Sequence, residues 1–171
     1  ANSKNDLERL ITEQEKADKL TNLIQVEKYE DEADQLNNVA NTIARLIKDQ
    51  GVPPEEIVVI TLDTRASESC LSQLRGLLDL KDIKSLSPGF VEQPSKFKEI
   101  DRITLTTAFR AKGNEASIVF VLNSQLVAND ATFRQRNAFF VSVTRSRGWC
   151  YISGYGDRMN DLQEEIQSII A

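Results

Sequence analysis

The feature that most constrains the fold is a short apolar run, "EIVVITLD" (56–63), in which β-branched residues predominate. Such a run is typical of a β-strand buried on both faces, as in sheets that helices cover on either side. Helical patterns do flank it in the sequence. The run therefore favours a fold in which helices and strands alternate along the chain.

Three segments have the apolar period of an amphipathic helix. The clearest spans residues 30–51, with acidic residues at its start and Lys48 near its end, as the helix dipole favours. Gly51 and the Pro53-Pro54 pair then prevent its continuation. Its apolar stripe consists of Leu36, Val39, Ala40, Ile43, Leu46 and Ile47. The other helical segments are 67–80 and 159–170, and residues 130–137 are expected to open a further helix.

Strand patterns alternate with these helices. The predicted strands are residues 22–29, 56–63, 103–109, 118–122 and 149–155. Residues 81–101 hold Pro88-Gly89 and Pro94, so we expect mainly loop with one short strand. By β propensity alone, "FFVSV" (139–143) is also a strand, although a helix-compatible segment precedes it. The alternation predicts an α/β fold with a largely parallel central sheet.

Length and composition limit the organisation and the chemistry. The 171 residues suffice for one compact domain, with a polar leader or linker at 1–20 and the domain at 21–171. No apolar run approaches the ~20 residues of a membrane span, and no signal peptide pattern occurs. Histidine is absent, which argues against a zinc site or a histidine triad. We expect a cytoplasmic protein with reduced thiols, although one disulfide between Cys70 and Cys150 stays open.

Charge is distributed unevenly along the chain. The net charge is −5, and residues 1–93 carry 11 Lys/Arg against 18 Asp/Glu. Residues 94–158 carry 10 Lys/Arg against 5 Asp/Glu. This local positive excess suits a phosphate-bearing partner, and the alternative is chance patterning on a solvated face.

The segment "TTAFRAKGNE" (106–115) joins two of the predicted strands and concentrates polar groups. Ligands of open α/β sheets bind beyond the carboxyl ends of the strands. We therefore expect Arg110, Lys112, Asn114 and Glu115 to lie together at that edge. Two cations and a carboxylate there would bind phosphate and a sugar hydroxyl. The alternative is an ordinary polar turn.

A second segment, "RNAFFVSVTRSR" (136–147), carries three basic side chains. Arginine suits phosphate because its planar guanidinium makes bidentate contacts and stays charged. The alternative is that Arg136, Arg145 and Arg147 only solubilise the surface. Each segment is weak alone, and the two together are far more specific.

Taken together, the two segments resemble motifs V and VI of superfamily 1 helicases of the UvrD/Rep type. Motif V has the form Thr-x-His-x-Ala-Lys-Gly-Leu-Glu-Phe, which corresponds here to residues 107–116. Motif VI has the form Arg-x-Leu-x-Tyr-Val-Ala-x-Thr-Arg-Ala, which corresponds to residues 136–146. Both occur in the family's order, and the resemblance covers roughly residues 20–160. It implies a C-terminal RecA-like (P-loop NTPase-type) three-layer domain, in a compact form without the large inserted subdomain.

The resemblance also implies roles for individual residues. Arg145 resembles the arginine that reaches the γ-phosphate of ATP, and Glu115 the glutamate that contacts the nucleotide sugar. Gly113 resembles the motif V glycine, where the backbone path leaves no room for a side chain. Thr107 and Phe109 resemble the segment that touches single-stranded DNA, with Phe109 in place of histidine. Arg110 and Lys112 are assigned to the nucleic-acid backbone, with a link to the nucleotide site as the alternative.

The resemblance is partial, because half of a helicase motor is missing from the chain. No phosphate-binding loop of the form Gly-x-x-x-x-Gly-Lys-Ser/Thr occurs, and neither does the family's Asn-Tyr-Arg-Ser segment. ATP and Mg²⁺ are thus expected to bind mainly on an N-terminal RecA-like domain of the same full-length protein. Single-stranded DNA is the expected further partner, with RNA as an alternative. The alternative functions are a non-enzymatic RecA-like interaction module and a helicase-like subunit of a nuclease complex.

Overall fold

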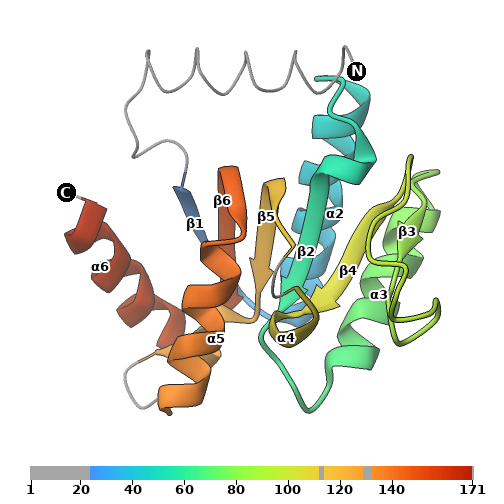
Figure 1. Cartoon of the computed structure of the whole chain (residues 1–171). Coiled ribbons are helices and arrows are strands. Elements are labelled where there is room, and N and C mark those ends of the chain that lie inside the picture. Colours follow the sequence, from blue (N-terminus) through green and yellow to red (C-terminus); the bar gives the residue numbers. More distant parts are fainter. Residues whose placement is uncertain (1–23, 112–113, 129–131, 171) are drawn as a thin grey trace.

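The computed structural model describes residues 24–111, 114–128 and 132–170, which form three layers around a six-stranded sheet (Figure 1). The strand order is β1-β6-β5-β2-β4-β3, and all five neighbouring pairs are parallel. The strands are β1 (Ile24–Tyr29), β2 (Ile57–Thr61), β3 (Ser85–Leu86), β4 (Ile103–Thr107), β5 (Ala116–Leu122) and β6 (Ser146–Tyr155). The predicted α/β fold with a parallel central sheet is confirmed.

Helices cover both faces of this sheet (Figure 1). The α-helices are α2 (Glu32–Lys48), α3 (Ser67–Asp79), α4 (Ala108–Ala111), α5 (Phe133–Val143) and α6 (Arg158–Ile170). Two short 3₁₀ turns are η2 (Pro54–Glu56) and η3 (Ser124–Val127). Helices α2 and α3 pack on one face, and α4, α5 and α6 pack on the other. The alternation of elements in the sequence thus becomes a three-layer sandwich.

The central strand β2 shows how the sequence builds two cores. All five of its residues are buried, as its continuous apolar run predicts. Ile57 and Val59 point into the cluster formed with α2 and α3. Val58 and Ile60 point into the cluster formed with α4, α5 and α6. Successive side chains of a strand face opposite sides, so β-branched residues are required at every position.

Helix α2 follows its predicted pattern closely. Asp31 caps its first turn, where one carboxylate oxygen accepts a 2.8 Å hydrogen bond from the Asp34 backbone N–H. Gly51 adopts φ +72° after the helix, a conformation that glycine tolerates best. The predicted stripe is buried except for Ile47, which is half-buried. The predicted helices at 67–80 and 159–170 are confirmed as α3 and α6.

Two local predictions are wrong. "FFVSV" is not a strand but the second half of α5. Thr132 and Gln135 form a reciprocal capping box that starts this helix, and Ala138, Phe139 and Val143 pack on the sheet. Capping and packing thus outweigh the β propensity of the segment. The strand predicted at 103–109 ends at Thr107, and the short helix α4 follows at once.

The two cysteines lie on opposite sides of the sheet and do not form a disulfide. Cys70 belongs to the cluster under α2 and α3, and Cys150 to the cluster under α4, α5 and α6. Burial raises the pKa of Cys70 to about 11 and that of Cys150 to about 12. Both groups are therefore protonated thiols near neutral pH.

The segment between α3 and β4 is compact. Residues 80–102 contain only β3 and loops, so no accessory subdomain is inserted there, as the compact helicase form predicts. The leader predicted at 1–20 lies outside the described residues. In the part of the chain that the structure describes, no helix is long and apolar enough to cross a membrane.

Candidate functional site at two edges of the sheet

The sheet separates the motif V residues into two groups. Thr107 ends β4 beside Thr61, and Thr61 pairs with Leu122 at the end of β5, so these three residues mark the carboxyl edge of the sheet. Glu115 directly precedes β5 and therefore lies at the opposite, amino edge. The seven residues of β5, at ~3.3 Å each, place the two edges roughly 20 Å apart.

This separation overturns one expectation from the sequence. Arg110 follows β4 at the carboxyl edge, whereas Asn114 and Glu115 lie at the amino edge. The three do not form one cluster, because the chain crosses a face of the sheet between them, as any connection between parallel strands must. Lys112 and Gly113 lie outside the described residues.

The amino edge brings the predicted nucleotide residues together. The backbone N–H of Ala116, the residue after Glu115, donates a 3.0 Å hydrogen bond to the backbone carbonyl of Arg145. Arg145 lies in the turn between α5 and β6, where its Nε donates to the Val141 carbonyl at 3.3 Å. Glu115 is exposed and Arg145 is partly exposed. A carboxylate and a guanidinium thus arise from neighbouring backbone positions at this edge.

A buried carboxylate supports this edge. Glu56, which is 6% exposed, accepts a 2.6 Å hydrogen bond from the Ser117 hydroxyl. The same oxygen lies 3.4 Å from Nη2 of Arg147. These contacts join the beginnings of β2, β5 and β6. Glu56 was not identified from the sequence, because an acidic residue before a buried strand is usually a solvated one.

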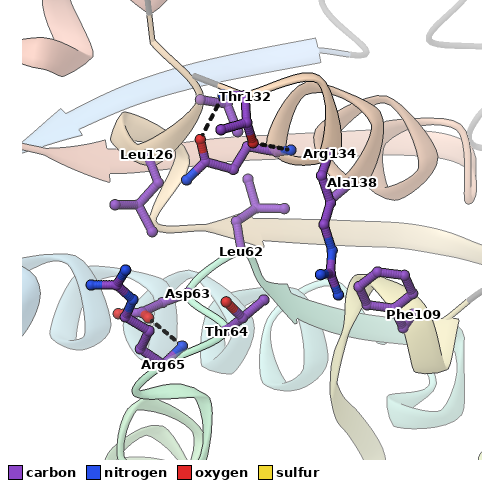
Figure 2. A pocket seen from close by; sticks show the side chains of 11 residues that line it. Leu62, Asp63, Thr64, Arg65, Phe109, Leu126, Thr132, Arg134 and Ala138 are labelled. Carbon is purple, nitrogen blue, oxygen red and sulfur yellow. Dashed lines mark hydrogen bonds between the residues drawn. The ribbon is translucent and has the colours of Figure 1, made fainter. Parts of the chain in front are cut away.

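The carboxyl edge contains a cleft of about 440 Å³ (Figure 2). Its walls are residues 62–65 after β2, Phe109 of α4, part of η3 and the first turns of α5. Phe109 is 59% exposed, and the Arg134 guanidinium carbon lies 4.9 Å from the centroid of its ring. Arg65 lies on the opposite wall from Arg134 (Figure 2). The cleft therefore combines an aromatic face with two arginines.

A buried polar network lies beneath the carboxyl edge. The Asn123 side chain accepts from Gln35 Nε2 at 2.8 Å and donates to Thr61 Oγ1 at 2.7 Å. The Asn123 backbone N–H donates to Gln35 Oε1 at 3.0 Å, and Ser153 Oγ donates to the same oxygen at 3.1 Å. Asn123 adopts φ +63°. All four side chains are buried, so the network fixes the ends of three strands against α2.

Arg110 is already engaged within the domain. Its Nη1 donates a 2.7 Å hydrogen bond to the Pro88 carbonyl, and its guanidinium carbon lies 4.7 Å from the centroid of the Phe90 ring. Arg136 of the second motif pairs with Glu165 at 2.7 Å. Thr107 is half-buried at the end of β4. The roles predicted for these residues toward ligands stay predictions.

The sequence analysis did not identify several residues of the carboxyl edge. Arg65 and Arg134 line the cleft, and Asn123 holds the network beneath it. Asn123 left a weak signal, because asparagine directly after a buried strand is suited to a positive φ. Within the described residues, no group of three or more Cys, Asp or Glu side chains is placed to hold a metal ion.

The layers and the parallel sheet are consistent with the RecA-like fold that the motif resemblance implies. Residues 102–153 match the family model of the UvrD-like helicase C-terminal domain. This segment contains both motif segments, so the resemblance inferred from the motifs is confirmed. The matched segment runs from β4 to β6 and so includes both edges.

A solved structure supports the same fold. The chain resembles the C-terminal domain of a possible DNA helicase from Lactobacillus plantarum WCFS1 with a TM-score of 0.60 and 14% identity. The similarity covers 81% of this chain and 80% of that chain. At this identity the likeness shows a shared fold. No curated protein matches the sequence.

Proposed function

We propose that the chain is the C-terminal motor domain of an ATP-dependent DNA helicase. The observation that carries this proposal is the division of motif V between the two edges of the sheet. One edge presents Glu115 beside Arg145, and the other presents Phe109 in a cleft. A motor domain needs such a division, because nucleotide and nucleic acid bind at separate sites that domain movement couples.

The amino edge is suited to half of an ATP site. Glu115 would contact the nucleotide sugar and Arg145 the γ-phosphate, since both side chains reach solvent from adjacent backbone positions. ATP would supply the phosphoanhydride bond, and Arg145 would stabilise negative charge on the transferred phosphoryl group. Gly113 is proposed as a further nucleotide contact. Mg²⁺ and the remaining phosphate contacts are assigned to an N-terminal RecA-like domain that pairs with residues 21–171.

The carboxyl edge is suited to single-stranded DNA. The exposed face of Phe109 offers a stacking platform for a base, and a stacked base contributes ~1–3 kcal/mol in such sites. Arg65 and Arg134 flank the cleft and would attract the phosphate backbone. Thr107 and Lys112 are proposed as further contacts. We propose a cytoplasmic location, where two free thiols would stay reduced.

Binding of a labelled single-stranded oligothymidylate by the purified chain tests the carboxyl edge. Phe109→Ala should weaken binding roughly 5- to 150-fold, which is the stacking contribution expressed as an affinity ratio. Arg145→Ala is the matched control, because it alters the other edge and should leave the affinity unchanged. Equal losses from both substitutions, or no loss from Phe109→Ala, would contradict the assignment of the edges.

ATP hydrolysis tests the amino edge. In the longer protein that supplies the phosphate-binding loop, Arg145→Ala should lower kcat by ~10³–10⁵, as for arginine fingers in related phosphoryl transfer. The chain by itself should not hydrolyse ATP. ATPase activity of the isolated chain that Arg145→Ala abolishes would show that the site is complete without a second domain.

One observation favours a second candidate function, a RecA-like interaction module without motor activity. Phe109 replaces the histidine of motif V, so this position cannot make the histidine's hydrogen bonds. A longer protein that binds DNA but whose ATP hydrolysis is unaffected by Arg145→Ala would favour the module. A nuclease domain elsewhere in that protein would favour a helicase-like subunit of a nuclease complex.

A further inference from the structure

We propose that Arg110 is a positioning residue that directs Phe109 into the cleft, and that its guanidinium occupies a seat on the loop at residues 87–92. This inference rests on the proposed function of Phe109 as a stacking platform. It gives Arg110 a role different from pairing with phosphate. The name "seat" is used below for Pro88, Gly89 and Phe90.

The seat is shaped for a guanidinium group. Nη1 of Arg110 donates to the Pro88 carbonyl at 2.7 Å, and the guanidinium lies over the Phe90 ring at 4.7 Å. A Cβ at Gly89 would lie 1.1 Å from Nη1 of Arg110, so any side chain there would displace the group. Gly89 also adopts φ +81°, which favours glycine. Glycine is thus needed at this position both for the backbone and for Arg110.

The loop that carries the seat is anchored to the core. The Glu92 carboxylate accepts from Arg75 of α3 at 2.9 and 3.2 Å and from the Ser87 backbone N–H at 2.6 Å. The Gly89 backbone N–H donates to the Glu92 carbonyl at 2.8 Å. Because α3 packs on the sheet, the seat is fixed relative to the sheet. The Arg110 guanidinium, when bound to this loop, therefore has a fixed position relative to the carboxyl edge.

Helix α4 depends on such an anchor. It has four residues, too few for a helix that is stable by itself. Ala108 and Ala111 are buried against the sheet, while Phe109 and Arg110 project outward as neighbours about 100° apart around the helix axis. Arg110 reaches the seat, and Phe109 faces Arg134 of α5. Holding Arg110 therefore limits the rotation of α4 and fixes the direction of the Phe109 ring.

Oligothymidylate binding separates a positioning role from a phosphate contact. Arg110→Ala and Gly89→Ala should weaken binding by a similar factor, about 3-fold or more and no larger than the effect of Phe109→Ala. Arg110→Lys keeps the charge but lacks the planar group that stacks on Phe90, so it should behave like Arg110→Ala. In a Phe109→Ala background none of the three should weaken binding further, because there is no ring to direct.

The salt dependence of oligothymidylate binding distinguishes a positioning role of Arg110 from a direct phosphate contact. A lost phosphate contact lowers the slope of log affinity against log salt by ~0.7 for single strands. We expect the slope to be unchanged in Gly89→Ala and Arg110→Lys. A reduced slope in Arg110→Ala, with near wild-type affinity in Arg110→Lys and Gly89→Ala, would overturn the inference. So would a loss of affinity that persists undiminished in the Phe109→Ala background.

Gly51→Ala is the matched control for backbone strain. Gly51 has a similar φ of +72°, and a Cβ there meets nothing within 4 Å. It lies before β2, away from the carboxyl edge. Gly51→Ala should therefore leave oligothymidylate affinity unchanged. An equal loss in Gly51→Ala and Gly89→Ala would assign the effect to backbone strain and overturn the seat.

Hydrogen exchange of the free protein tests the seat without nucleic acid. The α4 backbone amides should exchange faster in Arg110→Ala and in Gly89→Ala, and at the wild-type rate in Gly51→Ala. Unchanged α4 exchange in Arg110→Ala overturns the positioning role. If α4 exchange responds as expected but the wild-type chain binds no oligothymidylate, the seat stands as a structural device, and both the proposed function and the role toward Phe109 fail.

Discussion

The two edges of the sheet are held by different kinds of polar contact. At the amino edge, a buried carboxylate, Glu56, meets a half-exposed Arg147 and the Ser117 hydroxyl. At the carboxyl edge, neutral amides and hydroxyls bond to each other around Asn123 in the interior. A neutral network has no ion to desolvate, whereas an ion pair at the rim is partly screened by water. We therefore expect the carboxyl edge to be the more rigid of the two.

This difference fits the roles proposed for the edges. A stacking platform gains affinity when it is fixed before the ligand arrives, because no ordering cost remains. A half-site for ATP must instead meet groups on a second domain that moves, so charged side chains in turns are suited to it. The predictions below test the comparison in order of expected effect.

The largest effect on stability is expected from Asn123. Asn123→Ala removes the three side-chain hydrogen bonds to Gln35, Thr61 and Cys70, leaves the Gln35 amide nitrogen unpaired, and puts alanine at φ +63°. We expect a loss of about 2–4 kcal/mol in the free energy of unfolding, measured by urea denaturation. Asn123→Gly is the matched control, because glycine tolerates the backbone. Asn123→Gly should therefore be about 1 kcal/mol more stable than Asn123→Ala. Equal losses in the two variants would show that the positive φ contributes nothing to the effect.

A smaller effect is expected from Glu56 at the amino edge. Glu56→Gln keeps the shape and can still accept a hydrogen bond from Ser117, but it loses the ion pair with Arg147. We expect urea denaturation to show a loss of about 1 kcal/mol. Glu56→Ala, which also leaves Ser117 unpaired, should cost about 1 kcal/mol more. A Glu56→Gln loss as large as that of Asn123→Ala would remove the difference between the edges.

The sequence predicts the layers better than it predicts the edges. The apolar run of β2 and the stripe of α2 define burial through local periodicity, so both elements were found within a few residues. Residues 139–143 were missed as a helix because Thr132 and packing on the sheet decide their conformation. Periodicity does not contain that information.

The site is harder to predict for a topological reason. Arg110 and Glu115 are five positions apart in the sequence, yet they lie at opposite ends of parallel strands. Only the direction of the strands reveals this. Asn123 depends on Gln35, which is 88 positions away, so its role needs the tertiary structure. The motif resemblance located the functional segments, and the fold distributed their residues.

The loop at residues 87–92 should add an acid-sensitive contribution at the carboxyl edge. Burial raises the pKa of Glu92, but its bonds with Arg75 and the Ser87 amide outweigh this, so the pKa lies below the usual value of a glutamate. A lowered carboxyl pKa contributes stability above the unfolded pKa, and this contribution disappears as the pH falls through the folded pKa. Comparing unfolding at pH 7 and pH 3, Glu92→Gln should lose less stability on acidification than wild type does. An equal acid loss in both proteins would contradict this role of Glu92.

The smallest expected effect is on the reactivity of the two buried thiols. Cys70 touches the network at the carboxyl edge and Cys150 does not, so their labelling compares this edge with the rest of the domain. Burial raises the pKa of Cys70 to about 11, a value that bonds with Asn123 and Thr61 hold down, and raises that of Cys150 to about 12. Both thiols should react only slowly with iodoacetamide in the native protein at pH 7.5, because alkylation requires an exposed thiolate. After a short exposure, mass spectrometry of the denatured protein should find both cysteines almost entirely unlabelled.

The ratio of the Cys70 labelling rate to the Cys150 labelling rate distinguishes local opening of the carboxyl edge from unfolding of the whole domain. Cys70 touches the network at the carboxyl edge, with its sulfur 3.5 Å from the Asn123 amide nitrogen, and Cys150 does not belong to that network. Asn123→Ala should therefore raise the labelling rate of Cys70 more than that of Cys150, since local opening at this edge exposes only the first. Glu56→Gln should raise both rates by the same factor. If Asn123→Ala also leaves the ratio unchanged, the carboxyl edge opens only when the whole domain unfolds, and the network contributes to global stability alone.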